Sequence, residues 1–248
     1  MRLDEYLPLI VGGAIVLLIA LVFSWAAFGA PRRAARLFRR LEAQGYGPAR
    51  PDDLQLKQAL DRLTPIMFHT YALSTVTETS PWGVKLACAR YEGWTSRYVA
   101  MINRSVSRTT PQSTTLEHQF TIAVLEMRAL SFNHDVHVAG DRYTLDPQYG
   151  LRAVDEGSLG SLSSCYVVHT PDGTLAPLPT DLQKVLLDRA PFLSIRAATG
   201  SRADPFLFHA RIKFTPEGWG LISSEFVYHQ KKMNALMEAV DRISRSLG

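Results

Sequence analysis

Histidines supply the chain's main candidate for metal chemistry. His134 and His137 lie three residues apart, and His118 could provide a third nitrogen ligand to a zinc ion. Residues three apart in a strand point to opposite faces of a sheet, and an exposed or singly hydrogen-bonded histidine is far commoner than a metal ligand. We therefore predict no metal site.

Acidic side chains could supply a general acid and a general base. Five of them lie in predicted turns: Asp135, Asp141, Asp146, Asp155 and Glu156. Asp in a turn usually accepts backbone hydrogen bonds, and the spacing of these five does not require any two carboxylates to meet. The glycine-rich stretch 157–161 lacks the lysine of a phosphate-binding loop, and the signatures of dinucleotide folds, serine hydrolases and zinc proteases are absent. We predict no catalytic residue, no enzymatic activity and no cofactor.

An uncharged run at residues 7–28 dominates the chain's organisation. As a helix, 22 residues would extend about 33 Å, which matches a hydrocarbon core of about 30 Å. A cleaved signal peptide is the alternative, but such peptides begin with basic residues and have a shorter apolar core. We predict that this run forms a single transmembrane helix, which is not cleaved and anchors the protein. Together with the residues that flank it, the helix makes up the first predicted domain, residues 1–30.

Charges on either side of this run predict its orientation. Arg2, Asp4 and Glu5 precede it, whereas the arginines cluster after it at Arg32, Arg33, Arg36, Arg39 and Arg40. Because basic residues are retained on the cytoplasmic side, we place the N-terminus outside the inner (cytoplasmic) membrane and the remainder of the chain in the cytoplasm. Trp25 lies at the cytoplasmic end of the span and joins these arginines as a predicted membrane-interface residue.

Residues 31–49 are predicted to form a juxtamembrane segment. Pro31 should end or kink the span, and an amphipathic helix should follow over 32–44 with its apolar stripe at Leu37, Phe38 and Leu41. Its arginines would contact anionic lipid headgroups. A stop-transfer cluster without fixed geometry is the alternative.

Basic residues do not indicate nucleic-acid binding. The net charge is +4, but residues 1–49 contain 6 of the 27 basic and 3 of the 23 acidic residues, leaving 21 against 20 in residues 50–248. That balance predicts no nucleic-acid partner. Cys88 and Cys165 lie far apart, as expected of unpaired thiols in a reducing compartment.

Residues 50–248 predict one α+β domain with a largely antiparallel sheet and helices at its edges. A helix should begin at Asp52 or Asp53 and end before Pro65, a capping box at 180–183 should start a second helix that ends before Pro191, and a third should cover 225–247. Strands are predicted over the following ranges: 66–79, 84–92, 96–102, 120–130, 163–170, 191–197, 206–214 and a last one after the turn at 216–218. A short helix is possible near 147–156.

One polar stretch, 104–119, is rich in Ser and Thr and contains Pro111, so we predict an exposed loop. Long loops in compact domains are often functional. We predict that Ser105 and Arg108 in this loop contact a partner, together with Trp94 and the small-residue face at Gly12 and Gly13.

The arrangement of an N-terminal anchor, an arginine-rich stop and an α+β domain resembles many bacterial membrane-anchored proteins of unknown function. In topology it is also similar to the H subunit of purple-bacterial photosynthetic reaction centres, which spans once and caps its complex from the cytoplasm. The clear anchor and interfacial helix, together with the missing catalytic signatures, predict a non-catalytic accessory or scaffold subunit that stabilises a larger bacterial membrane complex, photosynthetic or respiratory. Its predicted partners are membrane lipids and integral membrane subunits. A membrane-tethered enzyme or small-ligand sensor is the alternative function.

Overall fold

The computed structural model describes residues 7–50, 53–65, 83–110, 113–140, 150–194, 210–223 and 230–248. The chain divides into two units, Met1–Tyr46 and Gly47–Gly248. The predicted strand 66–79 lies outside the described residues, as do 195–197, 206–209 and 225–229 of other predicted elements.

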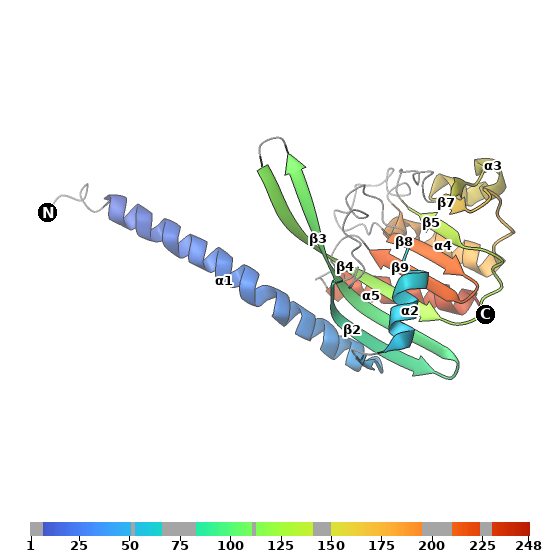
Figure 1. The fold of residues 1–248 in the computed structure, drawn as a ribbon, viewed down its shortest axis with the longest axis horizontal. Helices are drawn as coiled ribbons and strands as arrows, with labels where there is room; N and C mark the ends of the chain where they lie inside the picture. Colours follow the sequence, from blue (N-terminus) through green and yellow to red (C-terminus); the bar gives the residue numbers. More distant parts are fainter. Residues whose placement is uncertain are drawn as a thin grey trace. The chain divides into compact units, whose positions relative to one another are not determined.

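The first unit is built on one long helix, α1 (Leu7–Glu42). The prediction that Pro31 ends the first helix was wrong, because α1 continues through it (Figure 1). Proline removes one backbone hydrogen bond, but residues on both sides still satisfy their own backbone groups by remaining helical. Leu37 and Leu41 are buried and Arg39 is exposed, as the predicted amphipathic pattern requires. Within the described part of the chain, no helix combines the length and the apolar character that a membrane crossing needs.

The second unit contains a nine-stranded antiparallel sheet with the strand order β1-β2-β3-β4-β9-β8-β5-β7-β6 (Figure 1). Its strands are β1 (Gly47–Pro48), β2 (Gly83–Glu92), β3 (Thr95–Thr110), β4 (Ser113–Met127), β5 (Val136–Ala139), β6 (Arg152–Ala153), β7 (Val167–Thr170), β8 (Ala210–Thr215) and β9 (Gly218–Ser223). The described helices are α2 (Leu54–Leu63), α3 (Glu156–Leu159), the 3₁₀ helix η3 (Gly160–Ser164), α4 (Thr180–Leu193) and α5 (Gln230–Ser246). The predicted α+β class with an antiparallel sheet and flanking helices is confirmed.

Helix α2 covers one face of the sheet. Asp53 starts it by accepting the backbone N–H groups of Gln55 and Leu56, as predicted. Its buried residues pack with the inward side chains of β2, β3, β4 and β9, namely Leu56, Ala59, Leu60 and Leu63 with Ala89, Tyr98, Ala100, Ile102, Ala123, Leu125 and Ile222. Gly220 permits the close approach, since a Cβ there would lie 2.2 Å from the Leu63 carbonyl oxygen. We call this the α2 face.

Helices α5 and α4 lie on the opposite face (Figure 1). The predicted apolar stripe of α5 is buried at Met233, Leu236, Val240 and Ile243. Arg189 of α4 forms an ion pair with Glu238 of α5, which holds the two helices together. On this face the Phe214 ring stacks on both Phe132 and Trp219, with ring centroids 5.2 and 6.3 Å apart. These aromatic rings fill the central part of the core.

The predicted loop at 104–119 was wrong, because most of it is paired backbone. Register runs without interruption from Ser96↔Met127 to Thr110↔Ser113, so β3 and β4 form one long hairpin, with Pro111 outside the described residues. Among the described strands, β2 pairs with β3 as far as Asn103 and β9 pairs with β4 from Ile122. Beyond those positions the hairpin continues as a two-stranded arm. The Thr and Val residues of this stretch are β-branched and suit a strand, which the polar composition concealed.

Four predicted features of helices and strands also differ from the structure. Helix α4 has Pro179 at its N-cap without a side-chain cap, so no capping box forms, and the Gln183 side chain instead donates to the Leu178 carbonyl. The helix also runs through Pro191 to Leu193, which replaces the start of a predicted strand. Residues 160–164 form η3, so only Val167–Thr170 of the predicted strand 163–170 is extended. In the possible helix near 147–156, residues 147–149 lie outside the described residues, Arg152–Ala153 form β6, and α3 begins only at Glu156.

Candidate functional site

A buried polar row lies on the α2 face, in the half of the sheet made by β8, β5 and β7. Lys213, His137 and His169 are directly opposite one another on these three strands. The same line of paired residues continues across Gly220 to Leu125, Tyr98 and Ala89. Both histidines are buried, and the Lys213 side chain is 11% exposed and forms an ion pair with Asp135 at 2.9 Å. We call Asp135, His137, His169 and Lys213 the His–Lys cluster.

The electrostatics of the His–Lys cluster keep His137 neutral. Burial, assisted by the positive charge of Lys213, lowers the pKa of His137 to about 4, while Asp135 opposes this shift. A neutral imidazole offers one donor and one acceptor to a bound group. Within the described residues no set of three or more His, Cys, Asp or Glu side chains is arranged to hold a metal ion. The neutral imidazole of His137 can therefore take part in hydrogen bonds, while the charge of Lys213 is already paired with Asp135.

Sequence reasoning missed half of this cluster. It considered His134 and His137 together, but only His137 lies on β5, and it selected neither His169 nor Lys213. Asp155 accepts the backbone N–H of Ser158 in α3, as expected of an acid in a turn. Asp141 and Asp146 lie outside the described residues, and the side chain of His118 is not described.

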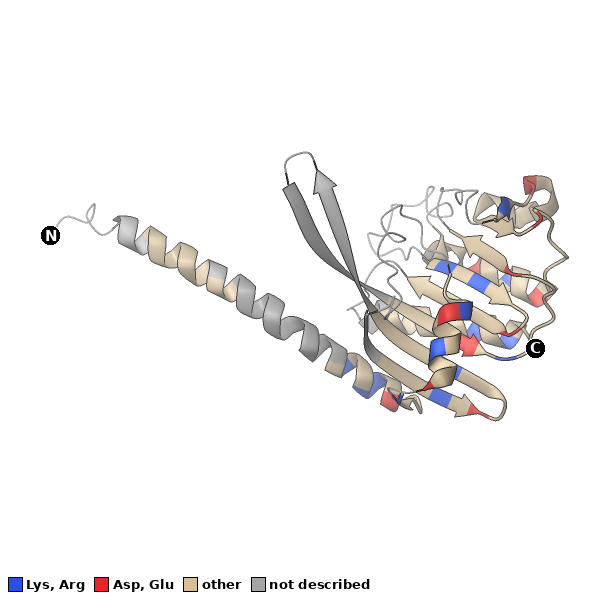
Figure 2. Cartoon of the chain, viewed as in Figure 1, with Lys and Arg blue, Asp and Glu red and all other residues tan. Residues whose placement is uncertain are grey.

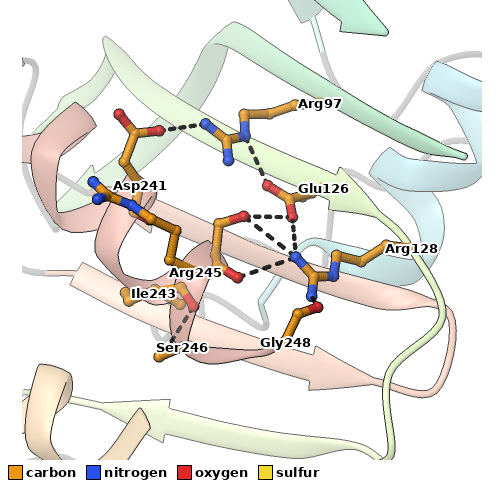
Figure 3. A network of polar contacts seen from close by, with 9 residues as sticks. Arg97, Glu126, Arg128, Asp241, Ile243, Arg245, Ser246 and Gly248 are labelled. Atoms are coloured by element: carbon orange, nitrogen blue, oxygen red, sulfur yellow. Dashed lines mark hydrogen bonds and ion pairs between the residues drawn. The ribbon is translucent and has the colours of Figure 1, made fainter. Parts of the chain in front are cut away.

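A second polar group, drawn in Figure 3, lies on the opposite face and links the sheet to α5. Arg97 on β3 and Glu126 on β4 are direct neighbours across the strands, and the Arg97 Nε–H donates to Glu126 Oε2 at 2.7 Å. Arg97 also donates to Asp241 Oδ1 of α5 at 2.5 Å. The Glu126 side chain is fully buried, and its other oxygen accepts from Ser244 Oγ at 2.8 Å and from Arg128 Nη1 at 3.3 Å.

Arg128 completes this second group, which we call the Arg–Glu network. Its Nη1 donates to the Ser244 carbonyl at 3.0 Å, and its Nη2 donates to the Gly248 carbonyl (Figure 3). Every charge in the network is thus satisfied by residues of β3, β4 and α5 and by residues that directly follow β4 and α5. A buried charge satisfied in this way holds elements in a fixed arrangement, so we assign the Arg–Glu network a structural role.

Exposed apolar side chains mark a third place, at the corner formed by the β2–β3 turn and the start of α2. Leu54 is 74% exposed, Tyr91 58% and Trp94 101%. The Tyr91 hydroxyl donates to Asp53 Oδ2 at 2.8 Å, which places Tyr91 beside the first turn of α2. Partial burial raises the pKa of Tyr91, and the hydrogen bond to Asp53 raises it further. We call Leu54, Tyr91 and Trp94 the corner patch.

The other predicted contact residues are distributed along two elements. Gly12 and Gly13 are exposed on α1, and a Cβ at either would meet nothing within 4 Å. Ser105 and Arg108 lie on β3, opposite His118 and Thr115, and their side chains are not described. The predicted membrane-interface residues Trp25, Arg32, Arg33, Arg36, Arg39 and Arg40 all lie on α1. Figure 2 shows the described arginines near the C-terminal end of that helix.

Comparisons with known proteins give little beyond this geometry. No family model matches the sequence, and no curated protein matches it significantly. A similar solved structure is the crystal structure of the mycobacterial trehalose monomycolate transport factor A, TtfA. It is 11% identical, the match covers 87% of this chain and 94% of that one, and the TM-score is 0.46. No argument about function rests on a similarity of this size.

Proposed function

We propose that this protein is a non-catalytic accessory or scaffold subunit of a larger bacterial membrane complex, anchored by α1 with its α+β unit in the cytoplasm. The observation that carries the proposal is the set of bare apolar side chains on α1. Val11, Ile15, Val16, Leu17, Leu18 and Leu21 are each at least 50% exposed. Six such side chains on successive turns would be costly in water and are favourable in lipid.

The proposed span is the uncharged run 7–28, and side chains are described for only part of it, residues 11–18, 20 and 21. Its length as a continuous helix matches a bilayer, and the arginines that follow at 32–40 support a cytoplasmic C-terminal side. The Arg–Glu network connects β3 and β4 to α5 through buried hydrogen bonds. These charged residues therefore support a structural role and not a catalytic one.

The test has two stages. Protease added to intact spheroplasts should leave residues 47–248 uncut, and the protein should stay in the membrane after alkaline carbonate extraction. Gentle detergent extraction and affinity purification should then recover a partner in fixed stoichiometry. Release by carbonate would refute the anchor, digestion in spheroplasts would reverse the topology, and a free monomer would refute the subunit role.

The His–Lys cluster favours a second candidate function, a membrane-tethered sensor of a small ligand. An anionic group that replaced Asp135 beside Lys213 would meet one cation and two buried imidazoles on the same face of the sheet. Under this alternative, added inorganic phosphate or a small carboxylate should shift the imidazole resonances of His137, and Lys213→Met should abolish the shift. Resonances that do not respond to either anion would count against it.

A further inference from the structure

The described residues of Gly47–Gly248 leave three large apolar side chains exposed, and all three belong to the corner patch. The other large apolar residues of this unit whose side chains the structure describes are buried or half-buried. Monomeric soluble proteins rarely leave a cluster of large apolar groups bare unless it binds something. The corner patch is therefore a candidate contact surface in a unit that otherwise buries its apolar residues.

Local structure fixes the patch in place. Glu92 pairs with Thr95, so the β2–β3 hairpin turns through Gly93 and Trp94 alone. Gly93 has φ +58°, which suits the first central position of a type II′ turn and leaves Trp94 at the tip. Tyr91 is held by Asp53 and by an edge-on contact with the Tyr98 ring, whose centroid is 6.2 Å away. A side chain held in this way loses little conformational entropy when it binds.

Chain connectivity puts the corner patch close to the point where the chain enters this unit. Gly47 is the first residue of the unit and pairs with Ala89 on β2. Because β1 and β2 are antiparallel, the N-terminal end of β1 points in the direction in which β2 runs from Ala89 to the β2–β3 turn. Tyr91 is two residues past Ala89, about 7 Å along the strand, and Trp94 lies within about 17 Å. The peptide bond before Gly47 leads to Tyr46, whose N–H donates to Leu41 of α1 at 3.0 Å.

From this arrangement we infer that the corner patch is a second membrane contact, which inserts at the headgroup level of the bilayer that α1 enters. The inference rests on the proposed anchoring by α1. Tyr and Trp favour this interface because their rings are apolar while their O–H and N–H groups remain hydrated. Cationic side chains suited to anionic headgroups lie beside the patch. Lys57 is exposed one turn along α2 from Leu54, and the positive charge of Arg50 acts on Tyr91.

Tryptophan fluorescence of the full chain in vesicles tests this inference. The vesicles contain phosphatidylcholine and phosphatidylglycerol, with or without bromine on the acyl chains. Trp25→Phe removes the tryptophan of the predicted span, so the difference between W25F and the W25F/W94F double variant reports Trp94 alone. The exposed side chain of Trp94 makes a loss of folding from W94F unexpected, and circular dichroism of both variants checks this.

We expect the Trp94 component to be blue-shifted, quenched by the brominated lipid and protected from aqueous iodide. Quenching by iodide alone would overturn the inference, because the patch would then be in water. Protection from both quenchers would also overturn it, since a protein surface would be covering the patch. As a control, Ser161→Trp in the double variant adds an exposed tryptophan on η3, in the stretch of chain between the edge strand β6 and its neighbour β7, and this residue should respond to iodide only.

Flotation of the same vesicles separates the two proposals. A chain that does not float with the vesicles refutes the anchor, and the inference about the corner patch falls with it. A chain that floats while Trp94 remains open to iodide refutes only the inference, and the proposed anchoring stands.

Discussion

Arg97 and Glu126 face each other across β3 and β4, with 2.7 Å between Nε and Oε2, and their side chains are only 8% and 0% exposed. Asp241 and Ser244 bring α5 to the same pair, so one buried charge on Glu126 connects two strands and a helix (Figure 3). This relationship ties the end of the chain to the middle of the sheet.

Glu126→Ala should therefore destabilise the protein strongly, because Arg97 would keep a buried charge without its main partner. We expect a loss of about 3–5 kcal/mol in the free energy of unfolding. Urea unfolding of the full chain in mild detergent, followed by tryptophan fluorescence, measures it. The matched control is Arg62→Ala, which breaks an ion pair to Glu217 of similar length whose side chains are 59% and 48% exposed. This control should cost no more than about 1 kcal/mol, and equal losses would refute a special role for the buried pair.

His137 should make the protein less stable in mild acid. Its folded-state pKa of about 4 lies below the ordinary value of 6.5, so the unfolded chain binds the proton more readily. The stability that neutral His137 contributes is fully present above pH 6.5 and is lost as the pH falls towards 4. Since one pKa unit corresponds to about 1.4 kcal/mol, the total loss in the free energy of unfolding is about 3 kcal/mol. His137→Gln should flatten the unfolding free energy across this window.

Lys213→Met provides a separate check on the cause of that shift. Because the positive charge of Lys213 helps to lower the pKa of His137, its removal should raise that pKa, measured by NMR titration of the imidazole. An unchanged pKa would mean that burial alone accounts for the shift.

Gly220→Ala should weaken the packing of α2 on the sheet. The new Cβ would lie 2.2 Å from the Leu63 carbonyl oxygen and 2.8 Å from Leu125 Cδ2, so helix or sheet must move. We expect a loss of about 1–3 kcal/mol, read from the urea midpoint. Gly47→Ala is the control, since a Cβ at Gly47 meets nothing within 4 Å. If both variants unfold at the same urea concentration, the close approach of α2 is not stabilising.

The hairpin arm can be shortened to test its proposed contact role. Arg104 pairs with Gln119, so replacing residues 105–118 by Asn-Gly closes a two-residue hairpin in the existing register. The unit should stay folded, because the described sheet pairs with this hairpin only nearer its base. If Ser105 and Arg108 contact a partner, recovery of that partner in affinity purification should fall.

A less extensive shortening serves as the control for the arm. Replacing residues 109–114 by Asn-Gly joins Arg108 to Thr115, which are also paired, and retains both predicted contact residues. This variant should recover the partner normally. Full recovery with the longer deletion would remove the arm from the proposed interface.

The sequence by itself determined the features that depend on near neighbours. Asp53 begins α2, and Gly45 follows the end of α1 with φ +84°. Alternation of apolar residues predicted β2, and a largely apolar run predicted the core of β4. The uncharged run 7–28 and the arginines that follow it can be recognised from the sequence without knowledge of the fold. Each of these signals is carried by residues within a few positions of one another, where backbone geometry and local hydrogen bonds decide the outcome.

Only the tertiary structure decided which polar residues meet. Arg97 lies 29 residues from Glu126 and 144 from Asp241, and Lys213, His137 and His169 come from three separate strands. Their meeting depends on the register of the sheet, and a slip of one residue would turn a strand's side chains to the other face. Register is set by the packing of both faces at once. For the same reason the polar stretch 104–119 could not be recognised as paired strands from its composition alone.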